Sequence, residues 1–173
     1  MVELIIVIIL IGILGAIGAG RFFNRSGFDA TAFAEQSAAM LRYAQKLAIA
    51  QNRPVYVQTS TSGLSLCYTS ASPCGTAARV PAPSGANSGS SGTRAFCTGG
   101  GAYDPAWDCE GVPAGASLGL NSAAPGNMYF NGLGRPYVAG DTGDSSFVAL
   151  TLTIKGDDVT RTVSVARETG YVF

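Results

Sequence analysis

The chain begins with an almost uninterrupted apolar segment, MVELIIVIILIGILGAIGAG, and no other feature constrains its fold as strongly. Every residue from 4 to 19 is apolar or glycine. Adding Val2, Phe22 and Phe23 brings the segment close to the roughly 20 residues that a membrane-spanning helix needs. We therefore expect residues 1–27 to form an apolar helix that either spans a membrane or packs among other apolar helices.

Glu3 is the only charged residue in this segment before Arg21. An isolated carboxylate in hydrocarbon is costly, so such a residue is usually paired and functional. The alternative is a tolerated Glu3 whose carboxylate reaches the lipid headgroups. A secretory signal peptide is disfavoured because it would carry basic residues ahead of the apolar run, whereas Arg21 and Arg25 follow it.

Four glycines interrupt the apolar segment, and Gly27 follows them. They are Gly12, Gly15, Gly18 and Gly20. Each interior glycine weakens a helix, so outside lipid this stretch is predicted to unwind locally. An equally good interpretation is that the glycines let neighbouring helices approach closely, as small residues do in membrane bundles.

Residues 28–52 predict an amphipathic helix, because they contain no proline and their apolar residues recur at helical spacing. The recurring positions are Ala30, Phe33, Ser37, Met40, Leu41, Ala44, Leu47 and Ala48. Pro54 should end the helix near Asn52. If this helix continued the apolar segment, the two would form one helix of about 50 residues and roughly 75 Å, of which only the second half can pack on a domain.

The pattern changes to period two after Pro54, which indicates strands. The best candidates are residues 55–57, 64–68, 147–154 and 161–166, with a turn at Gly156–Asp158 joining the last two; shorter candidates are 117–120, 128–130 and 171–173. We therefore predict an α+β fold. Its long N-terminal helix protrudes and packs by its C-terminal half on a mostly antiparallel sheet, within a globular domain of residues 28–173.

Four cysteines lie beyond the apolar segment: Cys67, Cys74, Cys97 and Cys109. They flank or fall within residues 69–101, which are dominated by Ser, Gly, Ala, Thr and Pro and contain too few large apolar residues to order themselves by burial. An even set of this kind favours two disulfides in an oxidising compartment, over four free thiols or a zinc site. Of the three possible connectivities we prefer the sequential one.

Composition argues against most enzymes and against nucleic-acid binding. Eleven basic and eleven acidic residues cancel, so no overall field attracts nucleic acid. Histidine is absent, which removes the usual general base and the commonest metal ligand. We therefore expect no catalytic residues, no cofactor and no metal. Asp104, Asp108 and Glu110, or Asp141 with Asp144, are alternative Ca²⁺ ligands, although turn chemistry explains them equally well.

The sequence resembles the type IV pilins and type II secretion pseudopilins. The opening MVELIIVIILIGILGA with its lone Glu3 resembles their amino-terminal segment. LRYAQKLAIAQNRPVYVQ, FNGLGRPY and the ending RTVSVARETGYVF are similar to the subgroup that contains GspH, FimT and the MSHA pilin protein MshC. In that family the carboxylate stands two places further along, so we expect two residues ahead of Met1.

The resemblance implies a mode of assembly. A prepilin peptidase would cut a short leader and methylate the new amino terminus, and the inner-membrane assembly machinery would then transfer the apolar helices from the membrane into the core of an extracellular bacterial filament. The partner of Glu3 would be the amino terminus of a neighbouring identical subunit, near Met1, and the pair would select the register of subunits.

Three roles are compatible with the resemblance: a filament subunit, either major or minor; a secretion pseudopilin like GspH; or a DNA-binding minor pilin of the FimT sort. The last role would need basic residues near the carboxyl terminus. The last five residues contain none, so we do not expect nucleic acid to be a partner.

Overall fold

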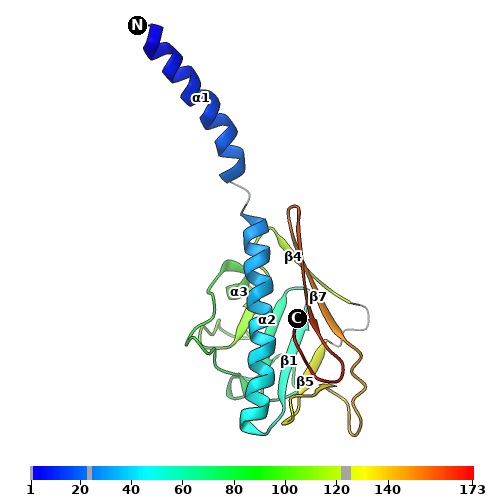
Figure 1. Cartoon of the computed structure of the whole chain (residues 1–173). Coiled ribbons are helices and arrows are strands. Elements are labelled where there is room, and N and C mark those ends of the chain that lie inside the picture. The colour runs from blue at the N-terminus through cyan, green and yellow to red at the C-terminus, as the bar shows by residue number, and fades with distance from the viewer. Residues whose placement is uncertain (1, 23–24, 122–125) are drawn as a thin grey trace.

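The computed structural model describes residues 2–22, 25–121 and 126–173. Its helices are α1 (Val2–Phe22), α2 (Ser26–Gln51) and α3 (Ser91–Phe96), with a short 3-10 helix at Thr76–Ala78. Its strands are β1 (Val55–Ser60), β2 (Gly63–Cys67), β3 (Cys109–Gly111), β4 (Ala116–Leu120), β5 (Asn127–Phe130), β6 (Pro136–Val138), β7 (Leu150–Gly156) and β8 (Val159–Val165). Figure 1 shows α1 extending away from all the other elements.

The sequence left open whether the segments 1–27 and 28–52 join into one helix, and the structure has two helices, α1 and α2. Arg25 precedes α2 and its side chain makes no capping hydrogen bond. The first two residues of α2 are Ser26 and Gly27, which are weak helix formers. At its other end α2 stops where predicted: Asn52 adopts the left-handed conformation (φ 48°, ψ 44°) and its N–H donates to the carbonyls of Ala48 and Ile49.

A membrane span was expected within residues 1–27. In the part of the chain that the structure describes, no helix combines the length and the apolar character needed to cross a bilayer. The expectation of a span is therefore not supported.

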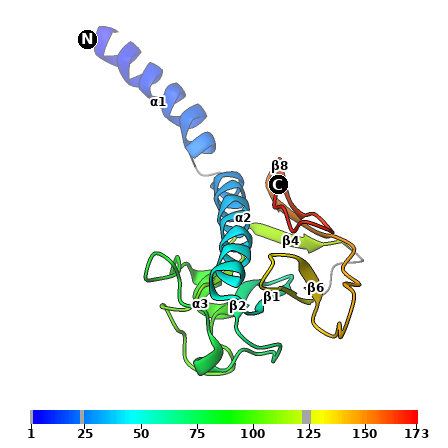
Figure 2. The same ribbon diagram turned by 60° about the horizontal axis from the view of Figure 1, so that its bottom comes forward.

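The strands form two antiparallel sheets, one of five strands in the order β3-β2-β1-β5-β6 and one of three in the order β4-β7-β8. The β7–β8 hairpin is confirmed, with Asp157 in its turn at φ 46°. At 171–173 the expected strand is reduced to a single bridge between Val165 and Val172. Helix α2 contacts strands of both sheets (Figure 2), which confirms the α+β class and the packing of the second helix on antiparallel strands.

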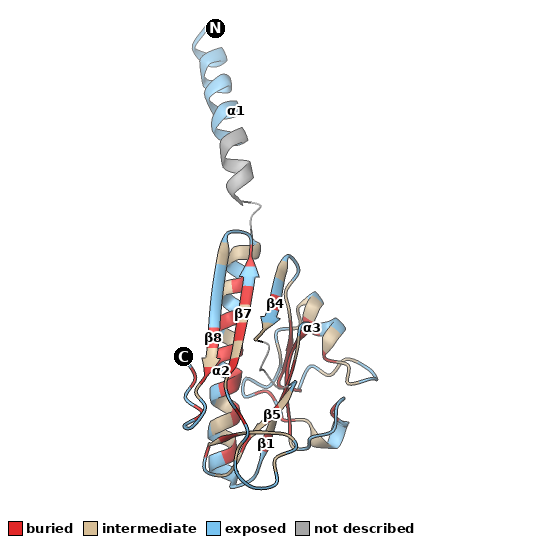
Figure 3. Cartoon of the chain, turned by 90° about the vertical axis from the view of Figure 1, so that its right-hand side faces the viewer, coloured by how far each residue is buried: buried red, intermediate tan, exposed pale blue. Residues whose placement is uncertain are grey.

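The core lies between α2 and the two sheets, and the buried residues of α2 run from Ala30 to Ala48; Figure 3 shows α2 behind the β7–β8 hairpin. Its α2 residues are Ala30, Phe33, Ala34, Ala38, Met40, Leu41, Ala44 and Ala48, and the largest fully buried side chains of the strands include Phe130, Leu64, Leu66, Leu150, Leu152 and Ile154. Five of the eight residues on the helix side are alanine, so the backbone of α2 approaches the sheets closely. Ser37 is also buried, and its hydroxyl donates to the carbonyl of Phe33 at 2.7 Å.

The β7–β8 hairpin fixes the first turn of α2. A Cβ built on Gly156 would lie 2.3 Å from the carbonyl oxygen of Ser26 and 2.8 Å from Cβ of Ala30. The Ser26 hydroxyl donates to the carboxylate of Asp157 in the hairpin turn. The end of α2 nearest α1 is therefore held by backbone-to-backbone contact with the hairpin.

Gly156→Ala should destabilise the domain by roughly 1–3 kcal/mol, because the added methyl group meets backbone that cannot rotate away. Urea unfolding of the full chain in a non-ionic detergent measures this change. Gly119→Ala is the matched control, since its Cβ would lie no closer than 3.7 Å to any neighbour. Equal stability of the two variants would contradict the close contact at Gly156.

Candidate assembly site

The side chains of α1 form the largest exposed apolar surface in the described chain. Residues 2–15 are all exposed, and their large apolar side chains range from 47% exposed at Val7 to 71% at Val2. Apart from Glu3, no polar side chain divides this surface into faces. A helix that is apolar all round is normally buried in a larger structure, and a large exposed apolar surface marks an interaction site.

Glu3 lies in the first turn of α1 and is exposed. A carboxylate there also interacts favourably with the positive end of the helix dipole. Within the described residues the ion pairs join Arg79 to Asp104 and both Arg135 and Arg167 to Glu168, so none includes Glu3. Met1, the other residue assigned to assembly, lies outside the described residues.

Gly12, Gly15, Gly18 and Gly20 all fall within α1. A Cβ built at Gly12 or Gly15 would have no neighbour within 4 Å, so no contact inside this chain requires glycine at these two positions. Local unwinding and close approach of a neighbouring helix both stay predictions.

A second apolar surface lies beside the start of α2. A cavity of about 570 Å³ is lined by Phe28, Thr31 and Ala32 of α2 and by Val159 of β8. Phe28 is 81% exposed. Arg161, Asp157 and Asp158 supply the charged part of the lining. The sequence pattern gave no indication of this groove, because it depends on how the hairpin meets the helix.

Two disulfides hold the Ser- and Gly-rich region in the sequential pairing preferred above. Cys67–Cys74 has a Cα–Cα distance of 6.2 Å, and Cys97–Cys109, which ties the end of α3 to β3, has one of 5.8 Å. The four half-cystines and Trp107 form a small core of their own, separate from the main one. Each bridge should contribute about 2–4 kcal/mol by restricting the unfolded chain.

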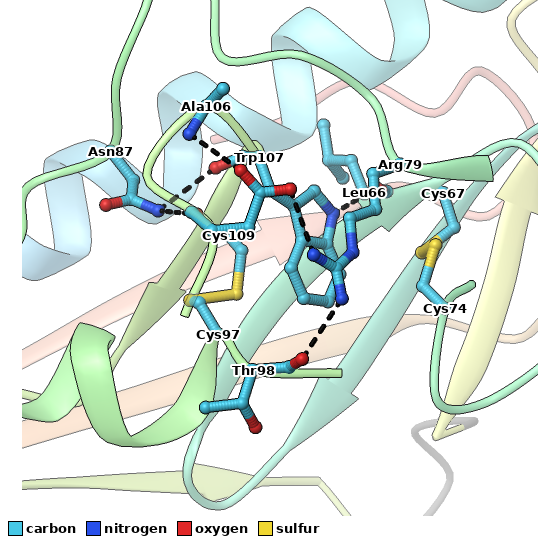
Figure 4. A network of polar contacts seen from close by, with 11 residues as sticks. Leu66, Cys67, Cys74, Arg79, Asn87, Cys97, Thr98, Ala106, Trp107 and Cys109 are labelled. Atoms are coloured by element: carbon cyan, nitrogen blue, oxygen red, sulfur yellow. Dashed lines mark hydrogen bonds and ion pairs between the residues drawn. A yellow bond between two sulfur atoms is a disulfide. The ribbon is translucent and has the colours of Figure 1, made fainter. Parts of the chain in front are cut away.

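Arg79 contacts several residues of the disulfide region, as Figure 4 shows. Its guanidinium forms an ion pair with Asp104 at 2.9 Å, donates to the Thr98 carbonyl at 3.0 Å and lies 4.6 Å from the ring centre of Trp107. Trp107 in turn donates its indole N–H to the Leu66 carbonyl at 2.8 Å. This network was not foreseen, because residue types alone do not tell which arginine meets which aromatic ring.

The carboxylates considered for Ca²⁺ do not converge. Asp104 forms an ion pair with Arg79. Both Asp108 and Glu110 face the other side of the sheet, towards α2. Asp141 accepts hydrogen bonds from the Ser146 hydroxyl and from the N–H groups of Ser146 and Val138, which lower the pKa of its carboxyl group. Among the residues with described positions, no group of three or more acidic, histidine or cysteine side chains could hold a metal ion.

The arginines of the carboxyl-terminal part, Arg135, Arg161 and Arg167, make contacts within the chain. Arg135 and Arg167 approach Glu168 at 2.7 and 3.4 Å, and Arg42 donates to the Val172 carbonyl at 3.2 Å. The Arg161 guanidinium is 3.4 Å from the Thr31 hydroxyl. These contacts do not support a DNA-binding role for the closing strands.

No family model matches this chain, and no curated protein does. Two crystal structures of the type IV minor pilin FimU from Pseudomonas aeruginosa are similar to it. One is 18% identical with a TM-score of 0.48, covering 83% of this chain and 90% of FimU; the other is 19% identical with a TM-score of 0.49, covering 86% and 90%. These likenesses concern the fold. They do not single out the GspH, FimT and MshC subgroup.

Proposed function

We propose that this protein is a structural subunit of a helical, extracellular type IV pilus-like filament, built by packing α1 of many identical chains into a common core. The observation that carries the proposal is the exposure of apolar side chains all round α1. A single apolar stripe would need one partner, whereas a surface apolar on every side needs partners all round it. Bundling of identical helices provides them.

Glu3 would set the register of the bundle. In the filament its carboxylate would meet the amino terminus of a neighbouring copy, and the pair would offset part of the cost of burying two charges. Only one stagger of the helices brings the two groups together, so the pair would select an arrangement more than it would add stability.

The domain would form the outer layer of the filament. The groove lined by Phe28 and Val159 lies where α2 begins, which is the part of the domain nearest to α1 in sequence. Its apolar lining supports contact between subunits near the filament core. A minor-pilin or pseudopilin role would use the same surfaces with a different set of partners, and no constellation of residues described above supports catalysis.

Ile9→Asp should abolish filaments, because a carboxylate in the middle of the packed helices would be buried without a partner. Ile9 is 55% exposed in the single chain, so the change should leave the domain folded. The measurement is the amount of this protein in the sheared filament fraction, with negative-stain electron microscopy.

Val148→Asp is the matched control, since Val148 is 56% exposed but belongs to the domain. It should assemble as the unchanged protein does. Filaments formed normally by Ile9→Asp would overturn the proposal, as would a wild-type chain that never enters the sheared fraction.

A further inference from the structure

The face of the sheet opposite the disulfide cluster carries two buried carboxylates. Side chains alternate along residues 107–110: Trp107 and Cys109 join the disulfide cluster, whereas Asp108 and Glu110 face α2. Asp108 and Glu110 are only 5% and 2% exposed. The backbone of Asp108 is fixed on both sides, with its N–H donating to the Val80 carbonyl and its carbonyl accepting from the Leu66 N–H.

The two carboxylates differ in how far they are satisfied. Glu110 accepts four hydrogen bonds: from the Gln36 amide at 2.5 Å and the Ser88 N–H at 2.6 Å on one oxygen, and from the hydroxyls of Ser88 at 2.5 Å and Thr93 at 2.7 Å on the other. Oδ2 of Asp108 is buried and has no hydrogen-bond partner. A buried acceptor without a donor is costly, so such a group needs an explanation.

Asp108 lines a cavity of about 180 Å³ between α2 and the segment 82–87. Since one water occupies about 30 Å³ in the liquid, this space is large enough for a small organic molecule. Its wall includes Ala39, Met40, Tyr43, Ala82 and Pro83, and its lining contains two carboxylates but no lysine or arginine. The cavity therefore has apolar wall residues beside polar ones and an ionisable carboxyl group at Asp108, and its lining holds no basic side chain.

We propose that this cavity binds a primary ammonium ion carried on a short aliphatic chain, with Asp108 as its counter-ion. The apolar wall suits the aliphatic stem, and the ring of Tyr43 adds an aromatic surface of the kind that attracts cations. A metal ion fits less well. Glu110 is already saturated, whereas Ca²⁺ takes six to eight oxygen ligands.

The charge state of Asp108 couples binding to pH. Burial, with a smaller effect of the nearby Glu110, raises the pKa of Asp108 to about 7. The other titratable groups that line the cavity are Glu110 itself and Tyr43 of α2, whose pKa is raised from its ordinary value of 10.0 by burial and by Asp108; segment 82–87 contributes none. An alkylammonium stays protonated throughout this range, so its affinity should follow the ionisation of Asp108.

The test is a titration of the full chain, in a non-ionic detergent, with n-butylamine hydrochloride, followed by isothermal calorimetry or amide NMR shifts. Binding should be about tenfold tighter at pH 8 than at pH 6, and n-butanol should not bind. Asp108→Asn should lose binding at least tenfold at pH 8, whereas Asp144→Asn, an exposed control, should bind normally. Nα-acetyl-lysine methylamide as a second probe distinguishes a lysine side chain from a free amine as the natural source.

A second variant keeps the proposal testable if Asp108→Asn is poorly folded. Ala39→Leu adds bulk at an exposed helix position on the cavity wall without touching the carboxylate, and it should weaken n-butylamine binding severalfold. Absence of binding of both amines by the wild-type chain at pH 8 would overturn the proposal. Equal binding of n-butylamine by wild type and Asp108→Asn would overturn it too.

Discussion

Replacing Glu3 with glutamine should raise the concentration needed for filament growth by about 100-fold or more. Removing one member of a buried ion pair costs about 3–5 kcal/mol, because the remaining charge stays buried alone, and each 1.4 kcal/mol is a factor of ten in an equilibrium constant. Glutamine keeps the shape of the side chain and one acceptor oxygen, so the main change is the loss of the charge. Sedimentation of filaments over a series of protein concentrations measures the effect.

The sign of this result separates the two interpretations of Glu3. If the carboxylate were merely tolerated in an apolar bundle, removing its charge would lower the cost of burial and assembly would be unchanged or improved. Glu35→Gln, at an exposed position on α2, is the matched control and should assemble normally. Acetylating the amino terminus should cause the same loss as Glu3→Gln, and the two changes together should cost no more than either alone, because they remove one shared interaction.

Those parts of the fold whose order comes from local pattern were predictable from the sequence. The alternating pattern of residues 147–154 and 161–166, with a Gly-Asp-Asp turn between them, predicted a hairpin, and the structure has it as β7 and β8, with β7 beginning at Leu150. Pro54 predicted the end of α2 correctly. The exposed apolar surface of α1, described for residues 2–15, follows directly from the apolar composition of that segment.

The parts that depend on distant contacts were not predictable. Strand β3 has the sequence CEG, which shows no apolar alternation, and it pairs with β2 in a region that the Cys97–Cys109 bridge holds together. Helix α3 lies inside the Ser- and Gly-rich region, and its Ser90 cap, which accepts from the Thr93 N–H at 3.2 Å, was the one local signal for it.

The contacts of three acidic side chains were likewise not predictable from the sequence. Asp104, Asp108 and Glu110 are close in sequence, which suggested a common cation. Strand alternation and the separate partners of each group instead give an ion pair with Arg79, a carboxylate in a cavity and a saturated hydrogen-bond acceptor. Spacing along the chain did not reveal this, because the outcome depends on which face of the extended segment α2 covers.

Asp108→Asn should remove a pH dependence of stability. In the folded chain the pKa of Asp108 is about 7, whereas in the unfolded chain it returns to about its ordinary value of 3.8. Between these two pH values Asp108 is protonated in the folded chain and ionised in the unfolded chain. The stabilisation present below pH 4 is therefore lost as pH rises towards 7, and the free energy of unfolding falls by at most about 1.4 kcal/mol per pH unit. The variant cannot lose a proton there, so at pH 8 it should exceed the wild-type free energy of unfolding by roughly 2–4 kcal/mol. Urea unfolding of the full chain at pH 5, 6, 7 and 8 measures both curves.

The slope of the free energy of unfolding against pH is a better test than its value at a single pH. The amide of asparagine adds a buried donor, and the cost of this donor is the same at every pH. Asp141 does not interfere, since the pKa of its carboxyl group is lowered and its stabilisation is lost only in more acidic solution than the range measured. Tyr43 titrates above the range, because its pKa is raised from 10.0.

Asp144→Asn should keep the wild-type slope. If Asp108→Asn keeps that slope as well, another group binds the proton and the assignment of the pKa near 7 to Asp108 is wrong. If instead n-butylamine at pH 8 raises the free energy of unfolding of the wild-type chain but not that of Asp108→Asn, the proton and the ammonium ion act on the same carboxylate.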